Sequence, residues 1–274
     1  MPCRAAPLPR GWSWNGVVHE FAGQSQGQSA SCEGKPVRPD DAVPLPHDLQ
    51  LALDALYGTF ASYRPQGPIE HSPLKPRSAV AALETKDLRD LDADDLRLYS
   101  GSAVWTVGSV SDLKYFFPRM AELALRGPVG SGGWASWVER LAPALSLPVE
   151  LAVVREFFRA LWRAVMEAQG EDLSLVDAID LLRALPVLFA DLSEFLQAFS
   201  PCASRAAARY LTDICTVGSA DAGLAKSTQL DHWLRHGALR DLHAAAKDFP
   251  PRDDDEHAEL QSATAQLRAL LERP

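Results

Sequence analysis

The sequence predicts an all-α protein of stacked antiparallel helix pairs, arranged either as an α-α superhelix of the HEAT kind or as an irregular multi-helix bundle. Apolar residues recur at i, i+3, i+4 and i+7 through most of the chain after residue 46. No segment combines strict period-two alternation with β-branched residues and hairpin turns, as strands do. Amphipathic helices have to bury their apolar stripes against one another, so packed helix pairs are expected.

The first expected helices lie between residues 46 and 125. The apolar residues of "PHDLQLALDALYGTFASY", which begins at Pro46, share one face and include Leu49, Leu53, Leu56 and Phe60. A second helix, "ADDLRLYSGSAVW", follows Asp92, whose carboxylate suits an N-cap. Gly108 is expected to break it, and Ser111 to start a third helix, "DLKYFFPRMAELAL".

The longest helix is expected from Pro148 to Gln169, because proline suits a first helical turn and Gly170 a C-terminal stop. The short segment "WASWVERLAPAL" precedes it. Further helical patterns follow in "SLVDAIDLLRALPVLFADLSEFLQAF", "CASRAAARYLTDICTV", "STQLDHWLRHGALRDLHAAAKDF" and "EHAELQSATAQLRALLER". Gly237 is a candidate interruption within the third of these patterns.

Residues 46–274 are expected to form a single helical domain, with the glycine-rich stretch 127–133 as a candidate joint. Residues 1–45 are rich in Gly, Ser, Gln and Pro and lack an apolar period, which predicts a largely disordered tail. The alternative is a loosely docked tail, in which the apolar residues of "GWSWNGVVHEF" contact the helical domain.

Two segments 68 residues apart share a pattern, "DLKYFFPRM" from Asp112 to Met120 and "DLLRALPVL" from Asp180 to Leu188. Helix-hairpin arrays repeat in units of about 34–47 residues, and this similarity would fit such an array. Chance similarity between apolar helices is the simpler interpretation.

Charge and cysteine content exclude several classes of protein. The formal net charge is −9 and no run of basic residues occurs, so neither nucleic acid nor an anionic membrane surface is the expected partner. No apolar run reaches the ~20 residues of a membrane span. The four cysteines form no C-x-x-C pair and suggest no disulfide framework. A cytoplasmic location is expected.

The first candidate site is the stretch "YSGSAVWTVGSVSDLKYFFPRMAEL", residues 99–123. The candidate ligand- or partner-binding residues are Tyr99, Trp105, Asp112 and Arg119. In the functional interpretation, Asp112 and Arg119 stand at the mouth of a helix corner, where arginine could grip a carboxylate or phosphate. In the structural interpretation, Ser111 or Asp112 caps the helix and Arg119 pairs with Glu122 at i, i+3. No catalytic residue is assigned.

His232 and His236 have the only metal-like spacing, i and i+4, and form a weak candidate metal pair. His243 would lie about 16 Å from His232 along a helix, so one ion cannot bind all three. The acidic run "DADD" is typical of a helix N-cap, and the run "DDDEH" is typical of a solvated loop. A phosphate-binding loop needs a strand before its glycines and a lysine after them, and the glycine-rich "RGPVGSGGW" has neither. No cofactor is therefore expected.

The segment from Thr106 to Leu123, together with the preceding "DLRLYSGSAVW", resembles a family of uncharacterised bacterial proteins. Their common line reads T-x-G-x-x-x-D-x-x-x-F-x-P-R-x-x-E-L, and the similarity extends to "EFFRALW" from Glu156 to Trp162. Many members carry a Cys-x-x-Cys pair before this block, where the present chain has "IEHSPL" from Ile69 to Leu74. The resemblance implies a bacterial source and no particular activity.

The leading hypothesis is a non-enzymatic helical protein that presents a groove or a helix face to another protein. It is motivated by the many amphipathic helices and by the lack of a catalytic motif. The competing hypothesis is a small-molecule-binding protein or enzyme with a pocket at the Tyr99–Arg119 corner. The sequence assigns neither the oligomeric state nor the biological process.

Overall fold

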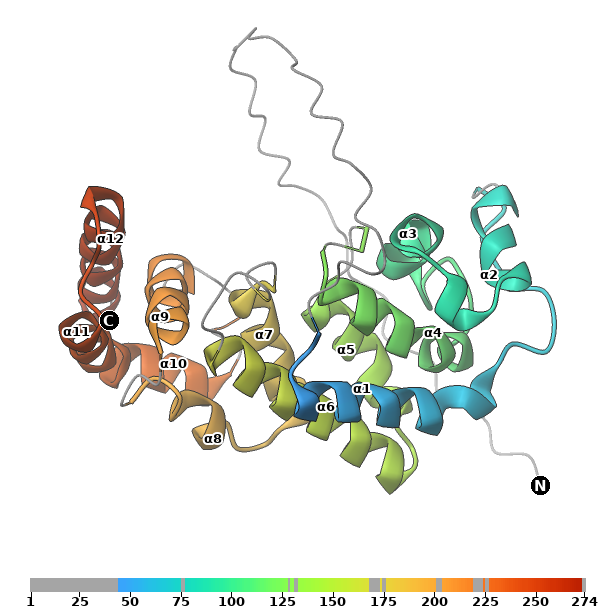
Figure 1. The fold of residues 1–274 in the computed structure, drawn as a ribbon, viewed down its shortest axis with the longest axis horizontal. Coiled ribbons are helices and arrows are strands. Elements are labelled where there is room, and N and C mark those ends of the chain that lie inside the picture. Colours follow the sequence, from blue (N-terminus) through green and yellow to red (C-terminus); the bar gives the residue numbers. More distant parts are fainter. Residues whose placement is uncertain are drawn as a thin grey trace, which may run out of the picture. The chain divides into compact units, whose positions relative to one another are not determined.

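The computed structural model describes residues 44–74, 77–127, 129–130, 133–167, 173, 176–200, 204–218, 224 and 227–272. The chain divides into two compact units, Met1–Ala42 and Val43–Pro274. The second unit contains every described residue (Figure 1). The predicted tail, apart from its last two residues, and part of the predicted joint at 127–133 lie outside the described residues.

The prediction of an all-α fold is confirmed, since the described residues form helices and turns and no strand. Two isolated β-bridges join Val107 to His71 and to Ala103. The α-helices are α1 (His47–Phe60), α2 (Ala81–Thr85), α3 (Ala93–Ser102), α4 (Val110–Ala124), α5 (Trp134–Leu141), α6 (Pro148–Glu167), α7 (Ala178–Leu188), α8 (Ser193–Leu196), α9 (Arg205–Gly218), α10 (Thr228–His236), α11 (Ala238–Asp248) and α12 (Asp254–Leu271). No helix among them is long and apolar enough to cross a membrane.

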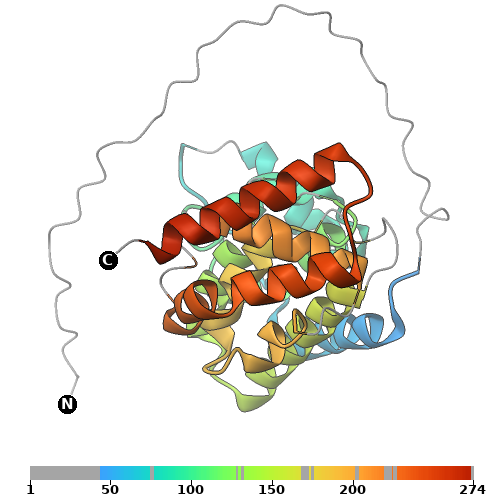
Figure 2. The same cartoon turned by 90° about the vertical axis from the view of Figure 1, so that its left-hand side faces the viewer.

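The helices stack against their neighbours in chain order. Helices α3, α4, α5, α7, α9 and α12 each pack on the next in that series (Figure 1). Helices α1 and α6 lie beside the series, α1 against α4 and α6 against both α7 and α9. At the C-terminal end, α10 and α11 contact α12, as the second view shows (Figure 2). Stacked helix pairs are thus the building principle of this unit.

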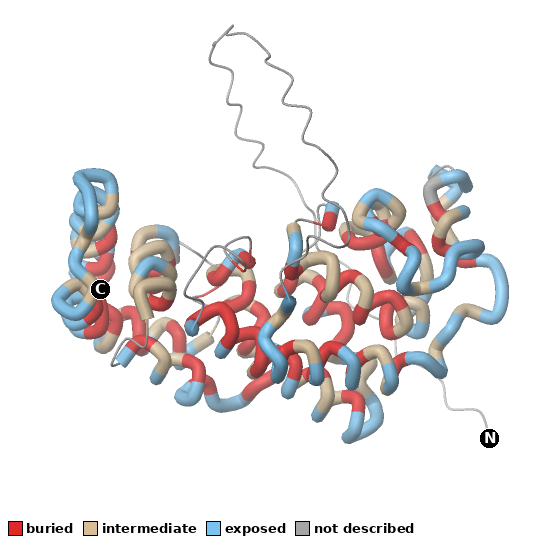
Figure 3. The backbone as a smooth tube through the Cα atoms, in the orientation of Figure 1, coloured by how far each residue is buried: buried red, intermediate tan, exposed pale blue. Residues whose placement is uncertain are grey.

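Burial follows the helical period. Along each helix the buried residues lie on the sides that face neighbouring helices (Figure 3). The buried positions of α1 include Leu49, Leu53, Leu56 and Phe60, as its apolar spacing predicts. In α6, Val154, Phe158, Leu161 and Val165 are buried, while Leu151 is only half-buried. Each large apolar side chain fully buried in this way contributes about 1.5–3 kcal/mol of transfer free energy.

The helix starts are set by capping carboxylates. Asp92 caps α3 as predicted, and Asp95 completes a capping box. The predicted start of α4 at Ser111 is wrong by two residues. Ser109 is the N-cap, and it exchanges hydrogen bonds with Asp112, the third residue of the helix. The reciprocal pair of hydrogen bonds in this capping box outweighs the signal of the single serine at position 111.

Two prolines lie inside helices. Pro118 lies within α4 and Pro186 within α7, the two segments that share a sequence pattern. Both helices continue past the proline, so Pro118 does not start a new helix. Gly237 does interrupt the C-terminal pattern, because α10 ends at His236 and α11 begins at Ala238.

A buried ion pair connects α4 to α6. Lys114 Nζ lies 2.9 Å from each carboxylate oxygen of Glu150, and the two side chains are 5% and 1% exposed. Lys114 also donates to the Tyr63 hydroxyl at 3.2 Å. That hydroxyl donates in turn to Glu150. Tyr63 belongs to η2 (Ala61–Tyr63), the short 3₁₀ turn that extends α1, so this cluster links three segments.

The hydrogen bonds of this cluster outweigh the cost of its burial. Burial alone would lower the pKa of Lys114, but its bonds to Glu150 and Tyr63 raise it above its usual value. Burial alone would raise the pKa of Glu150, yet its bonds from Tyr63 and Lys114 lower it. Both groups are therefore held in their charged forms, which is what a buried pair requires.

We expect Lys114→Met to destabilise the protein by about 3–5 kcal/mol, because it leaves Glu150 as a buried carboxylate without its counter-ion. Urea denaturation followed by circular dichroism measures this loss. The double variant Lys114→Met/Glu150→Leu should recover much of the stability, since it removes both charges. The control is Arg64→Met, which breaks an ion pair with Asp87 whose side chains are 63% and 77% exposed and should cost under about 1 kcal/mol. A Lys114→Met variant as stable as the control would contradict the account.

The ion pair should also make stability depend on pH in two windows. The pKa of Glu150 is lowered from its usual 4.5, so its stabilisation is present above pH 4.5 and is lost as the pH falls through the lower folded-state value. The pKa of Lys114 is raised from 10.5, so its stabilisation is complete below pH 10.5 and is lost as the pH rises through the folded-state value. Free energies of unfolding at neutral pH and at about pH 3 should show the wild type losing stability relative to the double variant. An unchanged difference would contradict this.

Candidate functional site

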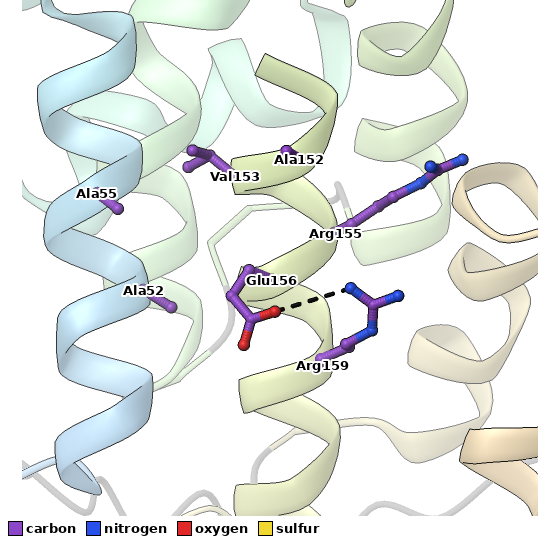
Figure 4. Close-up of a pocket in the computed structure, with 7 residues that line it drawn as sticks. All are labelled: Ala52, Ala55, Ala152, Val153, Arg155, Glu156 and Arg159. Atoms are coloured by element: carbon purple, nitrogen blue, oxygen red, sulfur yellow. Dashed lines mark ion pairs between the residues drawn. The ribbon is translucent and has the colours of Figure 1, made fainter. Parts of the chain in front are cut away.

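A groove opens on the surface between α1 and α6, with a volume of about 490 Å³. We call it the α1–α6 groove. Its lining residues come from those two helices alone and are Ala52, Ala55, Ala152, Val153, Arg155, Glu156 and Arg159 (Figure 4). The volume is typical of ligand and peptide sites, which range over about 300–1,000 Å³.

The groove exists because α1 and α6 have small side chains at the positions where they face each other at the surface. Ala52 and Ala55 lie one turn apart on α1, and Ala152 faces them from α6 (Figure 4). Ala55 and Ala152 are exposed, so no larger side chain covers the space between the two helices. The result is a shallow apolar floor.

Both ends of the helix pair are fixed by charged contacts. At one end, Arg163 of α6 lies 3.6 Å from Asp48 of α1. At the other end, Tyr63 bonds to Glu150. The start of α1 thus lies beside the end of α6, so the two helices run antiparallel and the groove has walls in a defined register.

Two further apolar side chains extend the floor along the same helix faces. Leu51 is followed four residues later by Ala55, and Val149 precedes Ala152 and Val153 by three and four residues. Leu51 and Val149 are each 55% exposed. Large aliphatic side chains beside an apolar groove on both of its walls are typical of a surface that another chain covers.

One side of the groove carries a row of arginines on α6, Arg155, Arg159 and Arg163, spaced four residues apart. Arg159 pairs with Glu194 of α8 at 3.0 Å and with Glu156 at 3.7 Å. Arg163 pairs with Asp48 and Glu156. These two guanidinium groups are already neutralised within the fold.

Arg155 differs from the other two. Its Nε donates to the carbonyl of Leu188 at 2.7 Å, and its guanidinium lies 5.7 Å from the ring centre of Phe189. Among the described residues no carboxylate pairs with it. Its side chain extends from α6 on the side away from α1 (Figure 4). The groove therefore has one oriented, uncompensated positive charge on its border.

The predicted corner brings two of its four candidate residues together. Tyr99 and Asp112 flank Gly108, since a Cβ built on that glycine would lie 3.1 Å from Tyr99 Cε2 and 3.2 Å from Asp112 Oδ2. Gly108 has φ +69°, a conformation that side chains disfavour. The Asp112 carboxylate is occupied in the capping box of α4. Tyr99 is buried, which raises its pKa well above the usual value, and its hydroxyl has no hydrogen-bond partner among the described residues.

Trp105, the third candidate, lies on the turn between α3 and α4 and is 73% exposed. The residue before it, Val104, has φ +69°, an outlier for a β-branched side chain. The guanidinium group of Arg140 stabilises the turn, because it donates hydrogen bonds to the carbonyls of Ser100 and Ala103, each at 2.9 Å. Its guanidinium also lies 5.2 Å from the ring centre of Trp105. The indole is thus displayed on a strained but well-supported turn.

Arg119 is not part of that group. It lies seven residues after Asp112 on α4, which is about 10 Å along the helix. Its Nε donates to the carbonyl of Leu91 at 2.7 Å, and its Nη1 donates to Glu122 at 2.6 Å. Glu122 also accepts from the Tyr57 hydroxyl at 2.6 Å. Arg119 therefore connects α4 to α1 and to the segment that precedes α3.

The Glu122 carboxylate shows the strength of these bonds. Burial alone would raise its pKa, but the bonds from Tyr57 and Arg119 lower it below the usual value. Burial and the same bond to Glu122 raise the pKa of Tyr57. The i, i+3 pair of Arg119 and Glu122 predicted from the sequence is confirmed. The sequence could not show the contacts with Leu91 and Tyr57, because both are distant in the chain.

His232 and His236 lie near the end of α10 with their ring centres 4.6 Å apart. His243 belongs to the next helix. Among the described residues no group of three or more His, Cys, Asp or Glu could hold a metal ion.

The sequence did not reveal the α1–α6 groove. Its two walls are about 100 residues apart in the chain, and exposed alanines give no signal of a binding site by themselves. Comparison with protein-family models, curated proteins and solved structures gives no significant match. The assignment of a function therefore depends on the geometry of the chain itself.

We expect Arg119→Met to destabilise the protein by about 2–3 kcal/mol, because it leaves the Leu91 carbonyl unpaired and removes a charged bond from Glu122. Thermal or urea denaturation measures the change. Arg126→Met is the matched control, since Arg126 is 46% exposed and lies 3.6 Å from the same carboxylate, and it should cost under about 1 kcal/mol. If Arg119 were instead reserved for a ligand, its removal would leave stability unchanged.

Proposed function

We propose that the protein is a non-enzymatic, cytoplasmic protein of bacterial origin that binds a segment of another protein in the α1–α6 groove. The observation that carries this proposal is the combination of an open apolar floor with the guanidinium of Arg155 on its border, which has no carboxylate partner among the described residues. An apolar floor provides affinity through burial, and a fixed charge provides orientation.

The chemistry of the groove defines the partner. Its floor suits aliphatic or aromatic side chains, and the exposed Leu51 and Val149 would be covered by such a segment. Arg155 suits a carboxylate, which a guanidinium can bind through two hydrogen bonds. An amphipathic helix with one apolar face and acidic residues beside that face satisfies both requirements, in the manner of helices that bind in grooves.

Binding is better supported than catalysis at this site. The seven lining residues contain no serine, cysteine, histidine or lysine that could act as a nucleophile or base. The guanidinium groups of the two arginines offer hydrogen-bond donors and no acceptor. Glu156 is 56% exposed and pairs with Arg159 and Arg163, which is typical of a surface carboxylate. These residues can hold a partner and orient it.

The alternative, a small-molecule or enzyme pocket at the Tyr99–Arg119 corner, has weaker support. It requires Asp112 and Arg119 to converge on one cavity. The Asp112 carboxylate is hydrogen-bonded in the capping box at the N-terminus of α4. The Arg119 side chain lies two turns further along α4 and is hydrogen-bonded to the Leu91 carbonyl and to Glu122. The unpaired hydroxyl of Tyr99 is the observation that still favours a ligand there.

Site-specific photo-crosslinking in bacterial cells tests the proposal. A benzoylphenylalanine placed at Ala152, on the floor of the groove, should form adducts with a distinct partner, and mass spectrometry should identify an apolar segment that contains acidic residues. The same group placed at Gln261, an exposed position of α12, is the control and should not form these adducts.

Two further variants make the result specific to the groove. Arg155→Glu should remove the adducts by reversing the charge that faces the partner, and Ala55→Trp should remove them by filling the floor. Ala55 is exposed, so Ala55→Trp should keep a thermal stability close to that of the wild type. Arg155→Glu also removes the bond to the Leu188 carbonyl and should cost about 1–3 kcal/mol, so its adducts are compared at a temperature where the variant is folded. Adducts that persist in both variants, or that carry basic segments, would contradict the proposal.

A further inference from the structure

His232 and His236 form a pair of exposed imidazoles near the C-terminus of α10. They are four residues apart, and their ring centres lie 4.6 Å from each other at an interplanar angle of 51°. Among the described residues neither ring takes part in a hydrogen bond or an ion pair. Two neighbouring imidazoles whose nitrogens have no other partner in the described fold can act as ligands.

The separation of the rings matches that of a chelate. A metal ion with nitrogen ligands at about 2.0–2.1 Å and ligand angles between octahedral and tetrahedral values places two imidazole centres about 4.5–5.2 Å apart. The observed 4.6 Å lies within this range. The ring separation is therefore compatible with one shared ion, and the helix already fixes the spacing of the two backbone positions.

The local charges do not oppose a cation. Arg235 lies between the two histidines in sequence, but both oxygens of Asp231 accept from its Nε, at 3.0 and 3.1 Å. Arg240 of α11 is paired in the same way with Asp241 at 3.0 Å. His236 is the last residue of α10, where the helix dipole favours positive charge.

Gly237 limits the site to two protein ligands. It separates α10 from α11, so His243 does not continue the row of His232 and His236. A structural zinc site takes four protein ligands and a catalytic one usually three, so this pair fits neither description. Two imidazoles with open positions are suited to a late first-row metal whose remaining ligands are water molecules.

We propose that His232 and His236 bind one late transition-metal ion, in the order of affinity Cu²⁺ over Ni²⁺ and Zn²⁺ that imidazole ligands give. Mg²⁺ and Ca²⁺ prefer oxygen ligands and should not compete. The site lies on a different helix pair from the α1–α6 groove, so it is independent of the function proposed above.

Titration calorimetry of the full-length, untagged protein with NiCl₂ in a buffer that does not chelate metals tests this inference. We expect one saturable site in the wild type, unaffected by excess Mg²⁺. His232→Ala and His236→Ala should each weaken it at least tenfold, and the double variant should abolish it. Both side chains are exposed, so these variants should fold normally.

His243→Ala is the matched control, because it removes another exposed histidine nearby that has no histidine four residues away. It should leave the affinity within twofold of the wild type. With Cu²⁺, electron paramagnetic resonance should show two coordinated nitrogens that the double variant loses. The inference is overturned if the double variant binds Ni²⁺ as tightly as the wild type, or if His243→Ala weakens binding as much as the other two substitutions.

Discussion

The buried ion pair between Lys114 and Glu150 is the constraint on which the central part of the structure depends. A charge removed from water must keep its partner, so α4 and α6 cannot slide past each other without separating two buried ions. Tyr63 joins the pair from the turn that extends α1. A hydrophobic contact would tolerate a small shift between these helices, whereas the four hydrogen bonds among these three side chains specify one register.

This register has a direct consequence for the α1–α6 groove. The Tyr63–Glu150 contact fixes one end of the helix pair, and the Asp48–Arg163 contact defines the other. Between these ends, α1 and α6 meet the surface with alanines, so the groove is a gap between two positioned helices. A partner would not have to order the walls before binding, and pre-organisation of this kind raises affinity without adding contacts.

The sequence predicts local features well and distant ones poorly. The cap at Asp92 and the pairing of Arg119 with Glu122 each depend on residues within a few positions, and both occur in the structure. The break expected at Gly108 is wrong by several residues, because α3 already ends at Ser102 with Ala103 as its C-cap. The sequence predicts the N-cap of α4 at Ser111 and the structure has it at Ser109. The two residues have the same hydroxyl group, and only the reciprocal hydrogen bonds between Ser109 and Asp112 distinguish them.

The contacts that sequence reasoning missed join segments far apart in the chain. Lys114 and Glu150 are each ordinary helix residues in the sequence, and nothing in their own segments marks them as buried. The groove also needs the register of α1 against α6, which the ion pair sets. Of the corner candidates, Tyr99 and Asp112 lie around Gly108, whereas Arg119 bonds to Glu122, as one interpretation of the sequence predicted, and to the Leu91 carbonyl, which the sequence did not predict. A charged residue beside an aromatic cluster signals a site only when its own neighbours do not already satisfy it.

The net charge of −9 bears on how an acidic segment could bind at all. Charges separated by more than a Debye length of about 8 Å are largely screened at physiological ionic strength, so most of the negative surface has little effect inside the groove.

The arginine row on α6 acts at contact distance, where screening is weak. Two of its members pair with three carboxylates, those of Glu194, Glu156 and Asp48, whereas Arg155 has no carboxylate partner among the described residues. A basic segment would meet repulsion at that point, whereas an acidic one would meet a group already held in place by the carbonyl of Leu188 and the ring of Phe189. Selectivity in such a groove comes from one positioned charge on an apolar floor, and the overall charge of the chain has little part in it.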